Sequence, residues 1–160
     1  MNNIHIFRGK IHSGKSTRLQ QWTDKTDNCL GVITLSISDK KYIMDIGNGE
    51  KRMLQIENET HAKDFVKVGN FIFLNDTFDW AKQILLRAHK KKPRWLIIDE
   101  IGHLELNGQG FEPVVSQLLP VLDSNLLFVV RERLTKRVIN HFNLKDFGKI
   151  IISEKLPDGE

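Results

Sequence analysis

The chain has 160 residues, of which 40% are hydrophobic and 28% are charged, and its formal net charge at pH 7 is +4. This composition excludes a low-complexity or fibrous chain, and the length predicts one globular domain over residues 1–160. A single cysteine excludes an intrachain disulfide, and the lack of a long apolar stretch predicts a cytoplasmic protein without a membrane span or signal peptide.

A strand, a glycine-bounded loop and a helix are predicted at the start of the chain. Ile4, Ile6 and Phe7 indicate a short strand, and residues 16–23 can form a helix without a breaker. Between them, residues 9–17 read Gly-Lys-Ile-His-Ser-Gly-Lys-Ser-Thr and fit the phosphate-binding pattern G-x-x-x-x-G-K-[ST]. A strand before this loop and a helix after it are the context that a phosphate-binding loop (P-loop) requires.

The chemistry expected of this P-loop follows from its backbone and a few side chains. Consecutive N–H groups form a concave nest that favours an anion, and glycine permits the backbone to approach a phosphate closely. Lys15 is expected to reach the β- and γ-phosphate oxygens, and the hydroxyl of Ser16 to bind Mg²⁺. The alternative is a glycine turn capped by Ser13, in which Lys15 is only solvated. The residues expected to bind the triphosphate are Gly9, Lys10, Ile11, His12, Ser13, Gly14, Lys15, Ser16 and Thr17.

The middle of the chain predicts an antiparallel extension of the sheet. Residues 31–37 and 42–46 are rich in β-forming side chains and are separated by a turn. The Gly-Asn-Gly turn at residues 47–49 precedes a third strand at residues 53–56. The polar segment 57–68 predicts a loop with a short helix. These consecutive hairpins indicate either an edge of the main sheet or a small flap over the nucleotide.

The second half of the chain alternates strands with helices. Strands are predicted at residues 70–74, 95–98, 126–130 and 149–152. The continuous apolar run at 95–98 is typical of a central parallel strand. Helical spacing predicts one helix capped by Asp76 or Thr77, another that kinks or ends near Pro120, and a short one around residues 138–142. The predicted fold class is therefore α/β, with a mostly parallel central sheet and an antiparallel hairpin extension.

Two acidic residues follow the apolar strand at 95–98. An acidic residue at the carboxyl end of a central strand faces the crevice in which α/β sheets bind ligands. Beside a P-loop, Asp99 is placed to hold Mg²⁺ together with Ser16. Glu100 is then a candidate general base for an attacking water. The alternative is a strand that ends in two solvated acids.

Residues 97–106 read Ile-Ile-Asp-Glu-Ile-Gly-His-Leu-Glu-Leu. They resemble the Asp-Glu-Ile-Gly-x-x-Glu-Leu signature of the thermophile-type, or cancer-related, nucleoside-triphosphatase family of small P-loop NTPases. The N-terminal P-loop, the Gly-Val-Ile-Thr strand at 31–34, the Val-Gly-Asn-Phe segment at 68–71 and the late strand at 128–131 extend the resemblance over most of the chain. The bulky P-loop residues 10–13 depart from the family, which usually has smaller residues there.

The resemblance implies a three-layer, RecA-like P-loop fold and Mg²⁺-dependent hydrolysis of ATP, GTP or related nucleotides to the diphosphate. The positions that match the family's motifs are Gly9, Gly14, Lys15, Ser16, Thr17, Asp99 and Glu100. No Asn-Lys-x-Asp segment for reading a guanine base occurs, which indicates weak preference among bases.

Arginines are expected to stabilise the charge that develops during phosphoryl transfer. Arg131 follows the strand at 126–130, and we expect it to contact the γ-phosphate or to form a salt bridge with Glu132 or another acid. Arg133 and Arg137 lie nearby in the sequence. The catalytic residues predicted are therefore Lys15, Glu100 and Arg131. His103 reads as a polar loop residue rather than a metal ligand, and Glu105 either orients the loop after Glu100 or pairs with a lysine.

Three functions are compatible with this sequence. The first is a nucleoside triphosphatase, and the second is a kinase in which Glu100 deprotonates a small acceptor instead of water. The third is a nucleotide-dependent switch or binding protein. The basic run at residues 90–92 has no interleaved aromatic residues and reads as a solvated helix end, so a nucleic-acid partner is not favoured. A homo-oligomer that supplies an arginine in trans is also compatible with the sequence.

Overall fold

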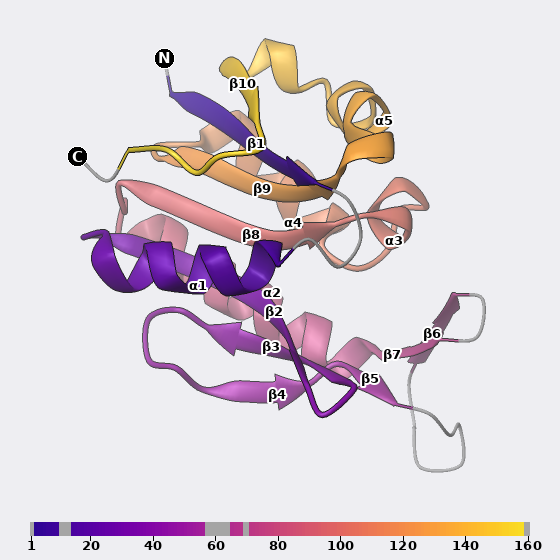
Figure 1. The fold of residues 1–160 in the computed structure, drawn as a ribbon. Helices are drawn as coiled ribbons and strands as arrows, with labels where there is room; N and C mark the ends of the chain where they lie inside the picture. Colours follow the sequence, from indigo (N-terminus) through magenta and orange to yellow (C-terminus); the bar gives the residue numbers. More distant parts are fainter. Residues whose placement is uncertain (1, 10–13, 57–64, 69–70, 159–160) are drawn as a thin grey trace.

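The computed structural model describes residues 2–9, 14–56, 65–68 and 71–158 (Figure 1). A seven-stranded sheet runs through the molecule in the order β10-β1-β9-β8-β2-β3-β4. Its strands are β1 (Asn3–Gly9), β2 (Cys29–Ile37), β3 (Lys40–Asp45), β4 (Lys51–Met53), β8 (Trp95–Ile101), β9 (Asn125–Arg131) and β10 (Lys149–Ser153). The pairs from β10 to β2 are parallel, and β2, β3 and β4 form antiparallel pairs. The predicted fold class, including the hairpin extension, is confirmed.

Helices cover both faces of this sheet and complete three layers. Figure 1 shows α1 (Lys15–Lys25) in front of the sheet, and α2 (Asn75–Lys90) and α4 (Glu112–Leu118) behind it. The remaining helices are α3 (His103–Leu106), α5 (Thr135–His141) and the 3₁₀ turns η2 (Leu119–Val121), η3 (Glu132–Leu134) and η4 (Leu144–Asp146). The helix expected to end near Pro120 does so, because α4 stops at Leu118 and continues only as η2. No helix in the described part of the chain is long and apolar enough to cross a membrane.

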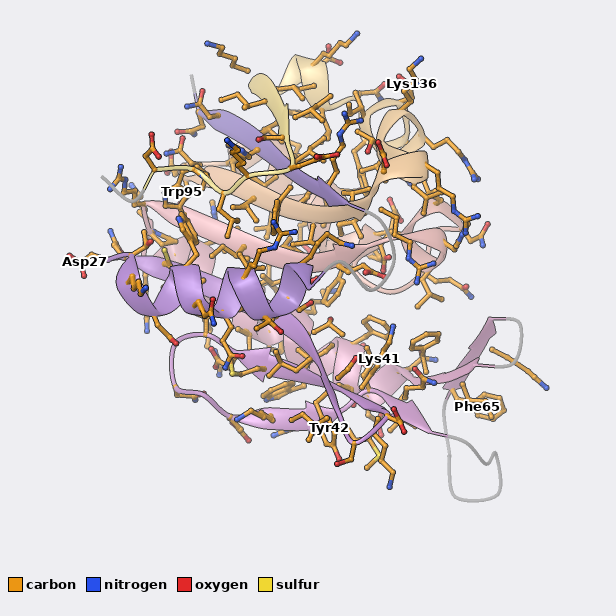
Figure 2. The ribbon with its side chains drawn as sticks, viewed as in Figure 1. Asp27, Lys41, Tyr42, Phe65, Trp95 and Lys136 are labelled. Carbon is orange, nitrogen blue, oxygen red and sulfur yellow. The ribbon has the colours of Figure 1, made fainter. Side chains whose placement is uncertain are left out.

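The alternation of side chains along the strands separates two hydrophobic clusters. Leu96 and Ile98 of β8 belong to the cluster under α2, α4 and α5, whereas Trp95 and Ile97 belong to the cluster under α1. Figure 2 shows Trp95 near α1, and the rings of Trp22 and Trp95 meet edge to face with their centroids 5.7 Å apart. Because β8 is buried on both faces, its sequence is continuously apolar up to Asp99.

A second, three-stranded sheet contains β5 (Gln55–Ile56), β7 (Phe71–Leu74) and β6 (Phe65–Val68) in that order. Two expectations are corrected here. The single strand expected at 53–56 is divided between the two sheets at the buried Leu54. The N–H of Leu54 donates to Lys41 O, and its carbonyl accepts from Leu74 N, both at 2.8 Å. The loop and short helix expected at 57–68 are wrong over 65–68, which pair with β7 as a strand, and 57–64 lie outside the described residues.

The start of α2 also differs from the prediction. Neither Asp76 nor Thr77 caps the helix, because α2 begins at Asn75 and places both residues in its first turn. The hydroxyl of Thr77 instead donates to the carbonyl of Met53. Thr77 therefore connects the start of α2 to β4 rather than satisfying the helix end.

A segment at the C-terminus, residues 154–158, lies along α1. The guanidinium of Arg18 donates to Glu154 O at 3.3 Å, and the indole of Trp22 donates to Pro157 O at 2.8 Å. Leu156 packs against the cluster under α1. Figure 1 shows this segment, in yellow, passing in front of β1. It covers part of the sheet face beside α1.

Candidate active site

Three parallel strands bring the predicted site residues to one edge of the main sheet. β9 lies between β1 and β8, and Gly9 at the end of β1 is in register with Arg131 at the end of β9. On the other side of β9, Asp99 of β8 is in register with Val129. Parallel strands end at the same edge of a sheet. Three features therefore converge there: Gly9 at the start of the P-loop, the acidic block Asp99–Glu100, and Arg131.

The P-loop leads directly into α1. Gly14 precedes the helix in the left-handed conformation, with φ of 76°, which a glycine adopts without the strain that a Cβ would add. Lys15 is buried, and its Nζ lies 3.4 Å from the carbonyl oxygen of Gly9, to which it donates. Burial lowers the pKa of Lys15, although the carboxylates of Glu100 and Asp99 oppose that shift.

The rest of the predicted phosphate site is described only in part. Lys10, Ile11, His12 and Ser13 lie outside the described residues, so their predicted contacts remain predictions. Thr17 is exposed in the first turn of α1.

Ser16 and Asp99 meet across the gap between α1 and β8. The hydroxyl of Ser16 donates to Oδ2 of Asp99 at 2.9 Å, and the carboxyl group is almost fully buried. Burial first, and then the neighbouring Glu100, raise the pKa of Asp99 to about 7. The hydroxyl of Thr34 donates to the backbone carbonyl of Asp99 at 2.6 Å. The sequence reasoning missed Thr34, although a polar side chain within the apolar strand β2 was the available signal.

The donors at Ser16 and Asp99 fit a Mg²⁺ ion. Oδ1 of Asp99 is buried without a hydrogen-bond partner in the described part of the chain, and a cation beside it would satisfy this atom and favour the charged carboxylate. Among the described residues, no group of three or more His, Cys, Asp or Glu side chains could hold a metal. Ser16 and Asp99 would supply a hydroxyl and a carboxylate oxygen, and Mg²⁺ commonly takes its other ligands from water and from substrate phosphates.

Glu100 leaves the regular pairing of β8. Asp99 and Ile101 pair with the consecutive residues Val129 and Val130, so Glu100 is the extra residue of a bulge, and the Asp99–Glu100 peptide bond is cis. Oε1 of Glu100 lies 3.8 Å from a guanidinium nitrogen of Arg131, and both side chains are partly exposed. Of the two contacts expected for Arg131, the structure has the salt bridge, and its partner is Glu100 rather than Glu132.

Glu105 closes the loop that follows the acidic block. Its carboxyl oxygens accept hydrogen bonds from the N–H groups of Gly102 at 2.8 Å and Phe111 at 2.9 Å. Burial raises the pKa of Glu105 to about 7 against the opposing effect of these donors. A Cβ on Gly110, whose φ is +60°, would lie 2.0 Å from Oε2 of Glu105. Of the two expectations for Glu105, orienting the loop after Glu100 is therefore confirmed.

His103 begins α3, so it lies in a short helix rather than in the expected loop, and it is beside Arg133. Its Nε2 is 3.4 Å from a guanidinium nitrogen of Arg133. Burial and then the charges of Arg133, Arg131 and Arg137 lower the pKa of His103. These interactions explain His103 as a polar residue next to the site and give no support to a role as metal ligand.

Comparisons with known proteins agree with this geometry. A family model described as NTPase matches residues 4–155. The crystal structure of THEP1 from the hyperthermophile Aquifex aeolicus matches the fold with a TM-score of 0.70 and 20% sequence identity, over 97% of this chain and 90% of that one. No match was found among curated protein sequences.

Proposed function

Because the chain belongs to the NTPase family, we propose that it is a Mg²⁺-dependent nucleoside triphosphatase, with residues 1–160 as one P-loop domain. In this reaction water attacks the γ-phosphorus, the bond to the β–γ bridging oxygen breaks, and a nucleoside diphosphate and phosphate are released. The observation that carries the proposal is the 2.9 Å contact between Ser16 and the buried Asp99, next to Lys15. This contact supports a cation-binding role for Ser16 and Asp99 and a phosphate-binding role for Lys15.

The P-loop binds the triphosphate in this proposal. Residues 9–17 surround the phosphates with backbone N–H groups, and α1 directs its N-terminus at them. Lys15 exchanges its contact with Gly9 O for the β- and γ-phosphate oxygens, which bear the charge that a buried ammonium needs. Base preference is weak, because none of the proposed contacts involves the base.

Ser16 and Asp99 hold Mg²⁺ in this proposal, Ser16 through its hydroxyl and Asp99 through its buried carboxylate. The bound ion supplies neutralisation of the charge on the β- and γ-phosphates. Thr34 supports this arrangement, since its hydrogen bond to the carbonyl of Asp99 fixes the end of β8 relative to β2.

Glu100 acts as the general base and Arg131 as a cation for the transition state. The carboxylate of Glu100 accepts a proton from the attacking water as the oxygen bonds to the γ-phosphorus. Arg131 lies 3.8 Å from Glu100 and, in this proposal, also contacts the γ-phosphate. One guanidinium can serve both purposes because it has five donors in a planar fork.

A phosphate-release assay tests the proposal with ATP, GTP, CTP and UTP in the presence of Mg²⁺. Lys15→Ala should lose nucleotide binding, because the ammonium is the buried charge that meets the phosphates. Glu100→Gln should bind nucleotide normally but lower kcat roughly 100-fold or more, the usual effect of losing a general base. Glu50→Gln, which changes a half-exposed surface carboxylate, is the control and should match the wild type.

Three outcomes would contradict the proposal. A normal kcat in Glu100→Gln would exclude Glu100 as the base. Transfer of phosphate to an added acceptor, without release of phosphate in its absence, would identify a kinase instead. An activity that appears only with a protein or nucleic-acid partner would identify a switch.

A further inference from the structure

Positive charge at the edge of the site extends beyond the residues used above. Arg131 ends β9, Arg133 lies in η3, Arg137 lies in α5, and His103 begins α3. Leu134 follows Arg133 and Val138 follows Arg137, and both are buried in the cluster behind the sheet, while the two arginines are exposed. The packing of Leu134 and Val138 therefore anchors η3 and α5 and leaves both guanidinium groups at the surface.

The side chains of Arg131, Arg133, Arg137 and His103 lie near one another, as one contact and several charge effects indicate. Arg133 reaches Nε2 of His103 at 3.4 Å. A guanidinium only donates hydrogen bonds, so Nε2 of His103 can accept from Arg133 only when the imidazole is neutral with its proton on Nδ1. All three arginines lower the pKa of His103, and Arg131 also acts on Lys15. Arg131 thus links the phosphate-binding lysine to the outer group of Arg133, Arg137 and His103.

The carboxylate of Glu100 acts on His103 and opposes the effect of the three arginines. Arg131 forms a salt bridge with Glu100, but in the part of the chain that the structure describes neither Arg133 nor Arg137 forms one. Two like charges four residues apart repel each other and cost a little stability. An anion between them would remove this repulsion, and a guanidinium fork matches the oxygens of a phosphate.

We propose that Arg133, Arg137 and His103 form a second oxyanion site, adjacent through Arg131 to the γ-phosphate position, for inorganic phosphate or a phosphate monoester. The inference rests on the proposed triphosphatase, since phosphate is the anion that this reaction releases. The same chemistry has two sources: the released phosphate on its way out, or the phosphate group of a second substrate. Either anion would lie next to Arg131, whose guanidinium has five donors.

The test titrates inorganic phosphate by calorimetry into protein saturated with Mg²⁺ and a non-hydrolysable ATP analogue, so that the P-loop is already occupied. Ionic strength is held constant with chloride. The double variant Arg133→Gln/Arg137→Gln is compared with Arg87→Gln/Arg94→Gln, which removes two exposed arginines around the turn between α2 and the amino end of β8. Both double variants lose the same charge, so general electrostatic attraction affects them equally.

We expect the phosphate affinity of Arg133→Gln/Arg137→Gln to fall about tenfold or more, because charge-assisted hydrogen bonds are lost, and that of the control variant to stay near the wild type. Equal phosphate affinity in the two variants, or no phosphate binding to the analogue-loaded wild type, would overturn the second site. Absence of analogue binding in the first step would instead contradict the proposed triphosphatase. A parallel titration with glycerol phosphate separates the sources: tighter binding than inorganic phosphate supports a second substrate, and weaker binding supports product release.

Discussion

Replacing Glu105 with glutamine would reveal how a buried carboxyl group holds the loop behind the acidic block. The side chain is 3% exposed and accepts two backbone N–H groups, from Gly102 and Phe111. Glutamine keeps the volume but has one acceptor oxygen, so one of these donors would face an NH₂ group instead. A buried donor without an acceptor costs roughly 1–3 kcal/mol, and we expect Glu105→Gln to lower the free energy of unfolding by about that amount at pH 5.

The pH dependence of this loss supplies a second magnitude. Burial raises the pKa of Glu105 from 4.5 to about 7. A carboxyl group with a higher pKa in the folded chain contributes stability that is present below pH 4.5 and is lost as the pH rises to about 7. The advantage of the wild type over Glu105→Gln should therefore shrink by roughly 2–3 kcal/mol between pH 5 and pH 8, because glutamine does not titrate.

Urea denaturation of the nucleotide-free protein at several pH values between 5 and 8 measures both quantities, provided that the slope m is unchanged. The titration of Asp99 occurs in both proteins and cancels in the difference. Glu50→Gln is the matched control, since its carboxylate is half exposed and its stability difference should be small at every pH. A difference for Glu105→Gln that stays constant from pH 5 to pH 8 would refute the reasoning, because Glu105 would then be ionised throughout.

Two further predictions concern the same fold. Gly110→Ala should destabilise the protein by about 2 kcal/mol or more in urea denaturation, because the new Cβ would lie 2.0 Å from Glu105. Gly49→Ala is the control and should cost only about 1 kcal/mol, since Gly49 has a similar positive φ but open space around it. Equal losses of stability in the two variants would contradict the clash. Burial lowers the pKa of His5 below its unfolded value of 6.5, so its contribution to stability is present above pH 6.5 and is lost as the pH falls through the folded value. The thermal midpoint of the wild type relative to His5→Phe should therefore drop on acidification from pH 7 to pH 5, and a constant difference would show that His5 stays equally protonated in both states.

The sequence predicts those parts of the site whose residues lie close together in the chain. The motif predicts a helix directly after its second glycine, and in the structure Gly14 precedes α1 while Lys15 and Ser16 begin it. Asp99 is predictable because an apolar run ends there. The family resemblance carried by residues 97–106 is likewise confirmed by the family model over residues 4–155.

The parts that the sequence does not predict depend on contacts between distant segments. Leu54 interrupts a strand because it bonds to both Lys41 and Leu74, and nothing local to residues 53–56 encodes that pairing. The partner of Arg131 is Glu100 because a bulge removes this residue from the ladder of β8 and β9. Such bulges respond to register between strands, which composition and periodicity do not reveal.

The position of β1 in the sheet has a consequence for how the protein folds. β1 spans Asn3–Gly9, but its two neighbours are the late strands Asn125–Arg131 and Lys149–Ser153. During synthesis β1 therefore emerges before both of its pairing partners, and its pairing with them requires the closure of a long loop. A chain truncated before residue 125 would carry the whole P-loop motif and yet lack the strands that hold it beside Asp99.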